Sequence, residues 1–188
     1  MATQWQLPDL SDLTTRTALD HVMNIIFRGA GTGDPRTDVL VKSFLRLVDK
    51  AVREYELARQ EAGSAGGDVL PLIRASGHLE NCITSMKRSL RFAEALFRSN
   101  ADIPRPKCLS VFSSHAEKTV TVLRDAIEHM DKRIIKNELR PEDALTPYLN
   151  GSLLELAGSR VSITELAGWL RQLHNFGVAL SDYRPGIR

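Results

Sequence analysis

The residues with the clearest chemical potential are Arg124 and His129, which lie five positions apart in the segment TVLRDAIEHMDKRI (121–134). Histidine has an unperturbed pKa of about 6.5, so its side chain can take up or release a proton near neutral pH. Arginine keeps its charge and makes planar, bidentate contacts to phosphate. Cleavage of a phosphodiester without a metal needs a base, an acid and a cation. Arg124 and His129, with Asp125 beside the arginine, are therefore candidate catalytic residues.

Helical geometry gives this segment a second interpretation. At about 100° per residue, Arg124 and His129 lie roughly 140° apart around a regular helix. Arg124 instead lies one turn from Glu128, and Asp125 lies one turn from His129, at spacings where side chains meet. The segment is therefore either a functional pair that needs a distortion or a second copy of the chain, or an exposed helix side with two polar pairs.

The run from Arg124 to His129 resembles the Arg-polar-x-x-x-His motif of the HEPN superfamily. The resemblance covers these six residues and the helical architecture expected over residues 12–139. Members of the superfamily are small helical bundles. Many are metal-independent endoribonucleases of toxin–antitoxin, abortive-infection and CRISPR systems, and others are non-catalytic.

This resemblance implies that Arg124, Asp125 and His129 act on RNA. It also implies a two-fold homodimer, because one histidine cannot easily perform both proton transfers. One branch of the superfamily carries a tyrosine two residues after the histidine, which a partner nucleotidyltransferase modifies. Asp131 stands at that position here, so the resemblance does not imply regulation of that kind. Asp131 could also pair with Arg124.

The same spacing occurs a second time, at Arg16 and His21 in the first predicted helix. Two features favour the pair Arg124 and His129 over this one. A polar residue, Asp125, follows the arginine, and the motif lies in a later core helix.

Cations are concentrated on the third predicted helix. Lys87, Arg91 and Arg98 fall within about 40° of one another around that helix. Together with Arg88 they are the candidate RNA-binding residues, since a row of cations can follow a phosphate backbone. The nearby residues Arg105 and Lys107 extend this basic region, and Glu94 interrupts it. The alternative is an ordinary solvated helix face.

The remaining candidates are weaker. His78 and Cys82 have the i,i+4 spacing of half a metal site, but no second pair accompanies them. We therefore predict no metal site and no cofactor. His115 and His174 are expected to be structural.

Helices must position these residues, because glycine- and proline-containing loops separate four segments with helical periodicity. The segments begin near Asp12 or Thr14, after Asp34-Pro35, near 69 and near 114. The first, third and fourth end near 28, 99 and 139, and the loop GSAGG (63–67) follows the second. Their apolar stripes predict a four-helix-type bundle. The stripes consist of Leu19, Val22, Met23 and Ile26; Val41, Leu45, Val48, Val52 and Tyr55; Leu79, Ile83, Met86, Leu90, Ala93 and Phe97; and Val120, Leu123, Ile127, Met130 and Ile134.

The C-terminal part predicts a small β-hairpin followed by a closing fifth helix. Two short apolar arms flank Ala157-Gly158-Ser159 within 152–163. Thr164 then caps a helix that runs to Tyr183. We expect its inward residues to be Leu166, Leu170, Leu173, Phe176 and Leu180, and we expect Trp5 and Trp169 in the core or in a lid over it.

The fold class is therefore all-α with a small hairpin, in a single domain over residues 1–188. The core bundle spans 12–139, and the hairpin and closing helix span 152–183. The last 37 residues are too few to form a core of their own.

The composition is that of an ordinary globular protein, with 43% hydrophobic and 26% charged residues. With 25 basic and 23 acidic residues, the net charge of +2 is too balanced to indicate nucleic-acid binding by itself. Cys82 and Cys108 fit reduced thiols of a cytoplasmic protein. We expect neither a signal peptide nor a membrane span, since no apolar stretch approaches about 18 residues.

The sequence thus predicts a HEPN-like metal-independent endoribonuclease, or an RNA-binding effector, of a prokaryotic stress or defence system. Its expected partners are a second copy of the chain, RNA, and a protein antitoxin or another protein. The alternative function is a non-catalytic helical-bundle module that binds another protein.

Overall fold

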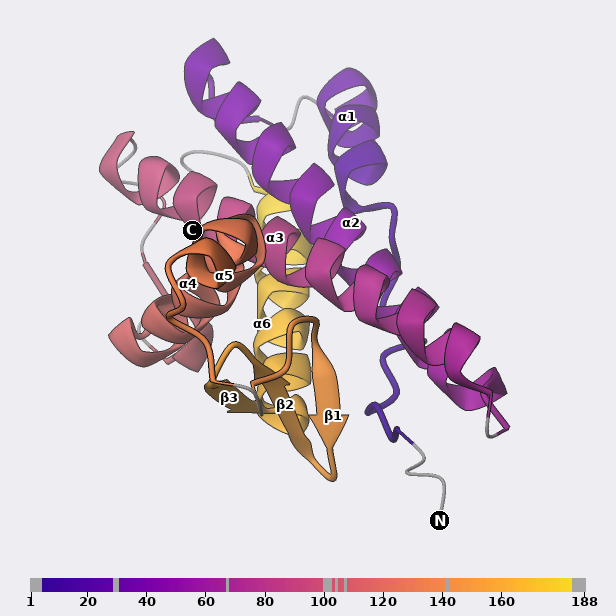
Figure 1. The fold of residues 1–188 in the computed structure, drawn as a ribbon. Coiled ribbons are helices and arrows are strands. Elements are labelled where there is room, and N and C mark those ends of the chain that lie inside the picture. The colour runs from indigo at the N-terminus through magenta and orange to yellow at the C-terminus, as the bar shows by residue number, and fades with distance from the viewer. Residues whose placement is uncertain are drawn as a thin grey trace.

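Two long helices, α2 (Pro35–Ser64) and α3 (Val69–Ser99), form the frame of the computed structural model (Figure 1). The structure describes residues 5–28, 31–66, 68–99, 103, 105–106, 108–140 and 143–183. The start predicted for α2 is confirmed: Asp34 caps the helix by accepting hydrogen bonds from the backbone N–H groups of Arg36 and Thr37, and Pro35 is its first residue. The bounds predicted for α3 are also confirmed.

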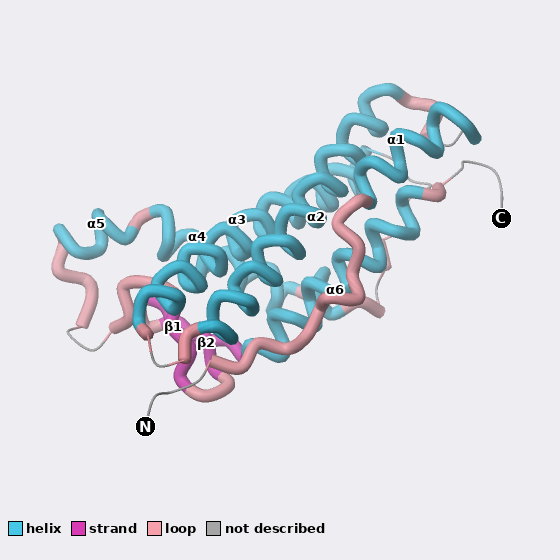
Figure 2. The backbone as a smooth tube through the Cα atoms, turned by 90° about the vertical axis from the view of Figure 1, so that its right-hand side faces the viewer, coloured by secondary structure: helices cyan, strands magenta, loops and turns pink. Residues whose placement is uncertain are grey.

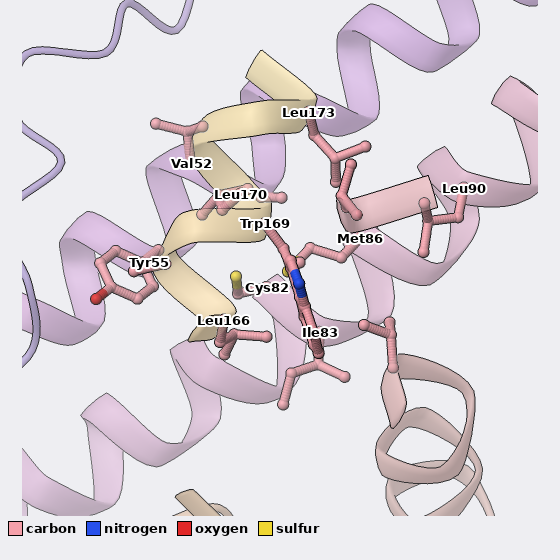
Figure 3. Close-up of a cluster of buried hydrophobic side chains, with 14 of the residues drawn as sticks. Val52, Tyr55, Cys82, Ile83, Met86, Leu90, Leu166, Trp169, Leu170 and Leu173 are labelled. Atoms are coloured by element: carbon pink, nitrogen blue, oxygen red, sulfur yellow. The ribbon is translucent and has the colours of Figure 1, made fainter. Parts of the chain in front are cut away.

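The apolar stripes predicted for α2 and α3 lie in the core, with only Phe97 partly exposed. The closing helix α6 (Ile163–Ser181) packs against α2, and its predicted inward residues are buried except for the half-buried Phe176. Figure 3 shows Leu166, Trp169, Leu170 and Leu173 of α6 gathered with Val52 and Tyr55 of α2 and with Cys82, Ile83 and Met86 of α3. Both tryptophans are buried, as predicted.

The predicted hairpin is present and carries a third strand. The strands are β1 (Tyr148–Asn150), β2 (Leu153–Leu156) and β3 (Ser159–Ser162), in the antiparallel order β1-β2-β3. Ala157 and Gly158 connect β2 to β3 with φ angles of 48° and 77°, the left-handed backbone that a two-residue turn requires. Leu154 pairs with Leu149 and with Val161, and all three side chains face the core.

The fourth predicted helix is divided and ends early, which corrects the sequence-based prediction. A short 3₁₀ turn, η1 (Ser110–Phe112), leads into α4 (Ser114–Glu128), and α5 (Met130–Ile135) follows. His129 separates α4 from α5 because its φ of −121° lies outside the helical range. Asn137 takes a φ of 54° just after α5, a left-handed conformation that asparagine tolerates at helix ends.

The first helix, α1 (Thr17–Arg28), corrects the prediction in two ways. It begins later than Asp12 or Thr14, and its apolar stripe does not face the core. The exposed fractions are 57% for Leu19, 43% for Met23 and 64% for Ile26. The neighbouring Phe27 is 71% exposed.

α1 lies against α2 and α6, whereas α4 lies against α3. In Figure 2, α5 and α1 lie at opposite ends of the molecule. α5 contributes no fully buried residue: Met130 packs partly buried against the core, and α5 lies against the end of α4. Across the described ranges, no helix is both long enough and apolar enough to span a bilayer.

Candidate functional site

The motif at the end of α4 places Arg124 among carboxylates. Its guanidinium donates to Oδ1 of Asp125 at 3.0 Å and forms an ion pair with Glu128 one turn later. About a quarter of the Arg124 side chain is exposed. The pair between Arg124 and Glu128 is the one that regular helical spacing predicts.

His129 is exposed at the break between α4 and α5, and no contact joins it to Arg124 or Asp125 through its side chain within the described residues. Its backbone N–H still donates to the carbonyl of Asp125, at 3.0 Å. The break is the kind of distortion that the motif needs, but within one chain it does not bring the imidazole to the guanidinium. Of the two polar pairs expected on an exposed helix side, Arg124 and Glu128 form theirs, whereas the side chains of Asp125 and His129 do not meet within the described residues.

The two residues of the second Arg-x₄-His pair lie in different environments, since His21 is buried and Arg16 is exposed. His21 is almost fully buried on the inner side of α1, where its Nδ1 donates to the carbonyl of Ser181 at 3.4 Å. Its Nε2 has no hydrogen-bond partner among the described residues, and burial lowers its pKa. Arg16 is exposed just before the helix, so these two residues do not form a joint site.

The four predicted RNA-binding cations do not share one environment. The Lys87 ammonium lies 3.6 Å from Glu117 of α4, and only 14% of the Lys87 side chain is exposed. Arg88, Arg91 and Arg98 are exposed, and they fall within roughly 80° of one another around α3. These three remain free of ion pairs to any residue that the structure describes.

Of the two residues that extend this basic region in the sequence, Arg105 has a structural role. Arg105 forms an ion pair with Glu94 at 2.6 Å and donates to the carbonyl of Phe112 at 2.9 Å. Arg105 therefore neutralises the acid that interrupts the basic region of the sequence. Lys107 lies outside the described residues.

A basic cleft of about 480 Å³ opens between the N-terminal end of α1 and the exposed sides of α2 and α3. We define it by its five cations, which are Arg16, Arg46, Lys50, Arg53 and Arg88. None of the five forms an ion pair with another described residue. Unpaired guanidinium groups that converge on one cleft can bind phosphate groups.

Asp49 is the one carboxylate among the described residues on the wall of this cleft, and the start of α1 donates hydrogen bonds to it. Its oxygens accept from the Thr17 hydroxyl at 2.6 Å, from the Thr17 N–H at 3.2 Å and from the Ala18 N–H at 3.0 Å. Asp49 thus caps α1 from another helix, and the positive end of the α1 dipole offsets its charge. The Asp49 carboxylate is therefore directed to the start of α1, and the five cations of the cleft remain without an ion pair to any described residue.

Three residues of the cleft could have been identified from the sequence. Arg46, Lys50 and Arg53 recur at i, i+4 and i+7 on α2, the spacing of a single helix face. The contribution of Arg16 gave no such signal, because it depends on where α1 docks.

The other candidate residues have structural partners. His78 Nδ1 lies 2.8 Å from Oε2 of the buried Glu54, and Cys82 is a free, fully buried thiol whose pKa is raised by burial. His115 lies 3.4 Å from Glu165, and His174 donates to the carbonyl of Thr14 at 2.8 Å. Among the described residues, no group of three or more His, Cys, Asp or Glu side chains could hold a metal ion.

Comparisons of the chain with models of protein families, with characterised proteins and with solved structures find no match. The resemblance to the HEPN superfamily therefore stays a prediction that rests on the motif in α4.

Proposed function

We propose that the chain is an RNA-binding effector whose basic cleft holds the phosphate backbone. The observation that carries this proposal is the convergence of five unpaired cations on one cleft. Asp49, the one carboxylate among the described residues that line the cleft, already accepts three hydrogen bonds from the start of α1. Arg91 and Arg98 lie on the same side of α3 as Arg88, so the RNA backbone could make further contacts beyond the cleft.

The residues of the cleft are suited to direct contacts with phosphodiester groups. Four of its five cations are arginines, which bind phosphate oxygens through two parallel N–H groups. Each phosphate that is neutralised releases counterions, so the affinity should fall steeply with salt. The chain's small net charge of +2 does not oppose this, because five cations still gather at the cleft.

The test compares two double variants with equal changes in charge. Arg46→Ala with Arg88→Ala removes two cations of the cleft, whereas Arg74→Ala with Arg160→Ala removes two exposed arginines outside it. Fluorescence anisotropy with labelled RNA at several salt concentrations gives the affinity and its salt slope. We expect the cleft variant to bind more weakly and its log–log slope to be shallower by about 1.4–1.8. Equal binding by both double variants would contradict the proposal.

A second candidate function, metal-independent RNA cleavage in a HEPN-like homodimer, is supported by the break in the helix at His129. The exposed imidazole there is free to meet a second copy of the motif. Catalysis would require the Arg124 guanidinium to leave Asp125 and Glu128 for the phosphate. The four-helix-type bundle, the homodimer and the stress or defence role belong to this same proposal.

The cleavage test is a gel of mixed RNA incubated with the protein in EDTA, beside the variants His129→Ala and His115→Ala. The catalytic proposal expects the wild type and His115→Ala to cut and His129→Ala to leave the RNA intact. Intact RNA in every lane at high protein concentration would rule out cleavage and leave RNA binding. The free thiols Cys82 and Cys108 agree with a cytoplasmic site of action, which we also propose.

A non-catalytic protein-interaction module is the remaining alternative. The exposed Ile134 and Ile135 of α5, a helix without buried residues, favour it. It expects the two double variants above to bind RNA equally and His129→Ala to have no effect on the cell.

A further inference from the structure

The outward face of α1 is an apolar ridge beside the basic cleft. We define the apolar ridge as Leu19, Met23, Ile26 and Phe27. These side chains fall within roughly 100° around the helix, so they form one stripe. Exposed apolar stripes of this kind commonly mark an interaction site in a soluble protein.

The inward face of α1 is polar, and it fixes the orientation of the ridge. Thr17 is bound to Asp49, as described above, and the Asn24 amide donates to the Ser181 carbonyl at 3.2 Å and to Asp182 at 2.8 Å. His21 also donates to Ser181. Turning the ridge towards the core would break these contacts and leave the Asp49 carboxylate and the Ser181 carbonyl beneath apolar side chains without these donors. The ridge is therefore held outward.

The ridge is continuous with the cleft through Leu19, which lines the cleft itself. From Leu19 to Phe27 the stripe continues along α1 for about 12 Å, at about 1.5 Å per residue. A ligand whose charged part lies on the cleft cations would therefore extend along an apolar surface that ends at an exposed aromatic ring.

We propose that this combined surface selects single-stranded RNA, with phosphates in the basic cleft and unstacked bases on the apolar ridge, where Phe27 stacks on one base. This inference rests on the proposed RNA-binding function and adds the class of substrate. A single strand presents both a charged backbone and the flat faces of its bases, and both are needed to cover this surface. A duplex hides its base faces in the stack, so it would cover the cations and leave the ridge in water.

The experiment measures the anisotropy of labelled single-stranded RNA of about 12 nucleotides, a length within the usual site sizes, and of its duplex. The variants are Phe27→Ala, Phe27→Trp and the control Ile135→Ala, which removes an 81% exposed side chain from α5. Circular dichroism confirms that each variant is folded, which we expect because all three changes are at exposed positions.

We expect Phe27→Ala to lose about tenfold in affinity for the single strand, at an unchanged salt slope, because stacking carries no counterions. Its affinity for the duplex should not change. Phe27→Trp should retain binding, since it keeps an aromatic face, and Ile135→Ala should match the wild type.

Equal losses on the single strand and the duplex, or no loss at all, would overturn the inference. If the cleft double variant weakens RNA binding and Phe27→Ala does not, base contact by the ridge is wrong and the proposed function stands. If neither weakens RNA binding, the proposed function itself is wrong. Sedimentation velocity tests whether a second copy of the chain occupies the ridge instead. If the protein self-associates and Phe27→Ala abolishes this without changing the RNA affinity, the ridge binds a second copy and the inference is overturned.

Discussion

At the residue scale, His21 is the side chain whose environment departs most from that of a surface histidine. It is buried between α1 and α6, its Nδ1 donates to a carbonyl, and its Nε2 has no partner among the described residues. Adding a proton to Nε2 would place an unpaired charge in the core. Burial accordingly lowers the pKa of His21 below its ordinary value of about 6.5.

This burial predicts a loss of stability in mild acid. Below about pH 6.5 the unfolded chain protonates His21 while the folded chain does not, so the unfolded state binds more protons. The free energy of unfolding should therefore fall as the pH drops from about 7 towards the lowered pKa. Replacing His21 with Gln should reduce this dependence, because glutamine does not titrate.

Urea unfolding followed by circular dichroism at several pH values measures this effect. His115→Gln is the matched control, since His115 is exposed. The prediction is wrong if His21→Gln and His115→Gln have the same pH dependence of unfolding between about pH 7 and 5.5.

The local environment of Arg124 was partly predictable from the sequence. The i,i+4 spacing anticipates its ion pair with Glu128, and the contact with the adjacent Asp125 adds to it. The helix break at His129 could not be anticipated, because the segment contains no glycine or proline to mark it.

At the element scale, the best-predicted helices are those in which the apolar stripe of the sequence is also the buried face. α2 and α3 each bury a long stripe against the other, and α2 carries its own capping residue, so the local signals and the packing agree. The third strand was missed because β1 is only three residues long and lies within a stretch rich in turn residues.

α1 shows why an amphipathic pattern alone does not decide which side is buried. Its apolar stripe is clear, but the helix is capped by Asp49 and held through Thr17, His21 and Asn24. Those tertiary hydrogen bonds join residues more than 30 positions apart, so no local reading of the sequence contains them. The cleft and the ridge both depend on this docking.

The docking of α1 can be tested at Asp49. Asp49→Ala removes the acceptor of three hydrogen bonds and leaves the first turn of α1 uncapped. We expect it to lower the free energy of unfolding by about 1–2 kcal/mol, the usual range for loss of a cap. Faster amide hydrogen exchange should be confined to α1.

Asp131→Ala, at an exposed position of α5, is the control with the same change in charge. Asp49→Asn should fall between the two, since its amide oxygen still accepts. Identical unfolding and exchange in Asp49→Ala and Asp131→Ala would show that the cap does not hold α1.

At the scale of the whole molecule, the two candidate sites lie on different elements and share no residue. The basic cleft is lined by the start of α1 and by α2 and α3, whereas the motif lies at the end of α4; Figure 2 shows α1 and α5 at opposite ends of the molecule. Substitutions that share no partners act independently, so effects at the cleft and at His129 should add.

α6 passes across α2. Gly177 makes this crossing possible: a Cβ there would lie 3.1 Å from Cδ2 of Leu45 and 3.7 Å from Cε1 of Phe44. The ring of Phe44 in turn meets Phe176, which also contacts Phe97 and Phe112. Residues of α2, α3, η1 and α6 are therefore joined at this one place.

The same substitution at two glycines of α6 tests this crossing. Gly168 has open space around its Cβ position, so Gly168→Ala should gain about 0.5–1 kcal/mol of stability from helix propensity. Gly177→Ala should gain less, because its new methyl group must displace Leu45. Gly177→Leu should lose about 1–3 kcal/mol through overpacking. Urea unfolding of the three variants measures these differences. An equal gain at both alanine positions, with Gly177→Leu as stable as the wild type, would mean that α6 does not approach α2 at Gly177 as closely as described.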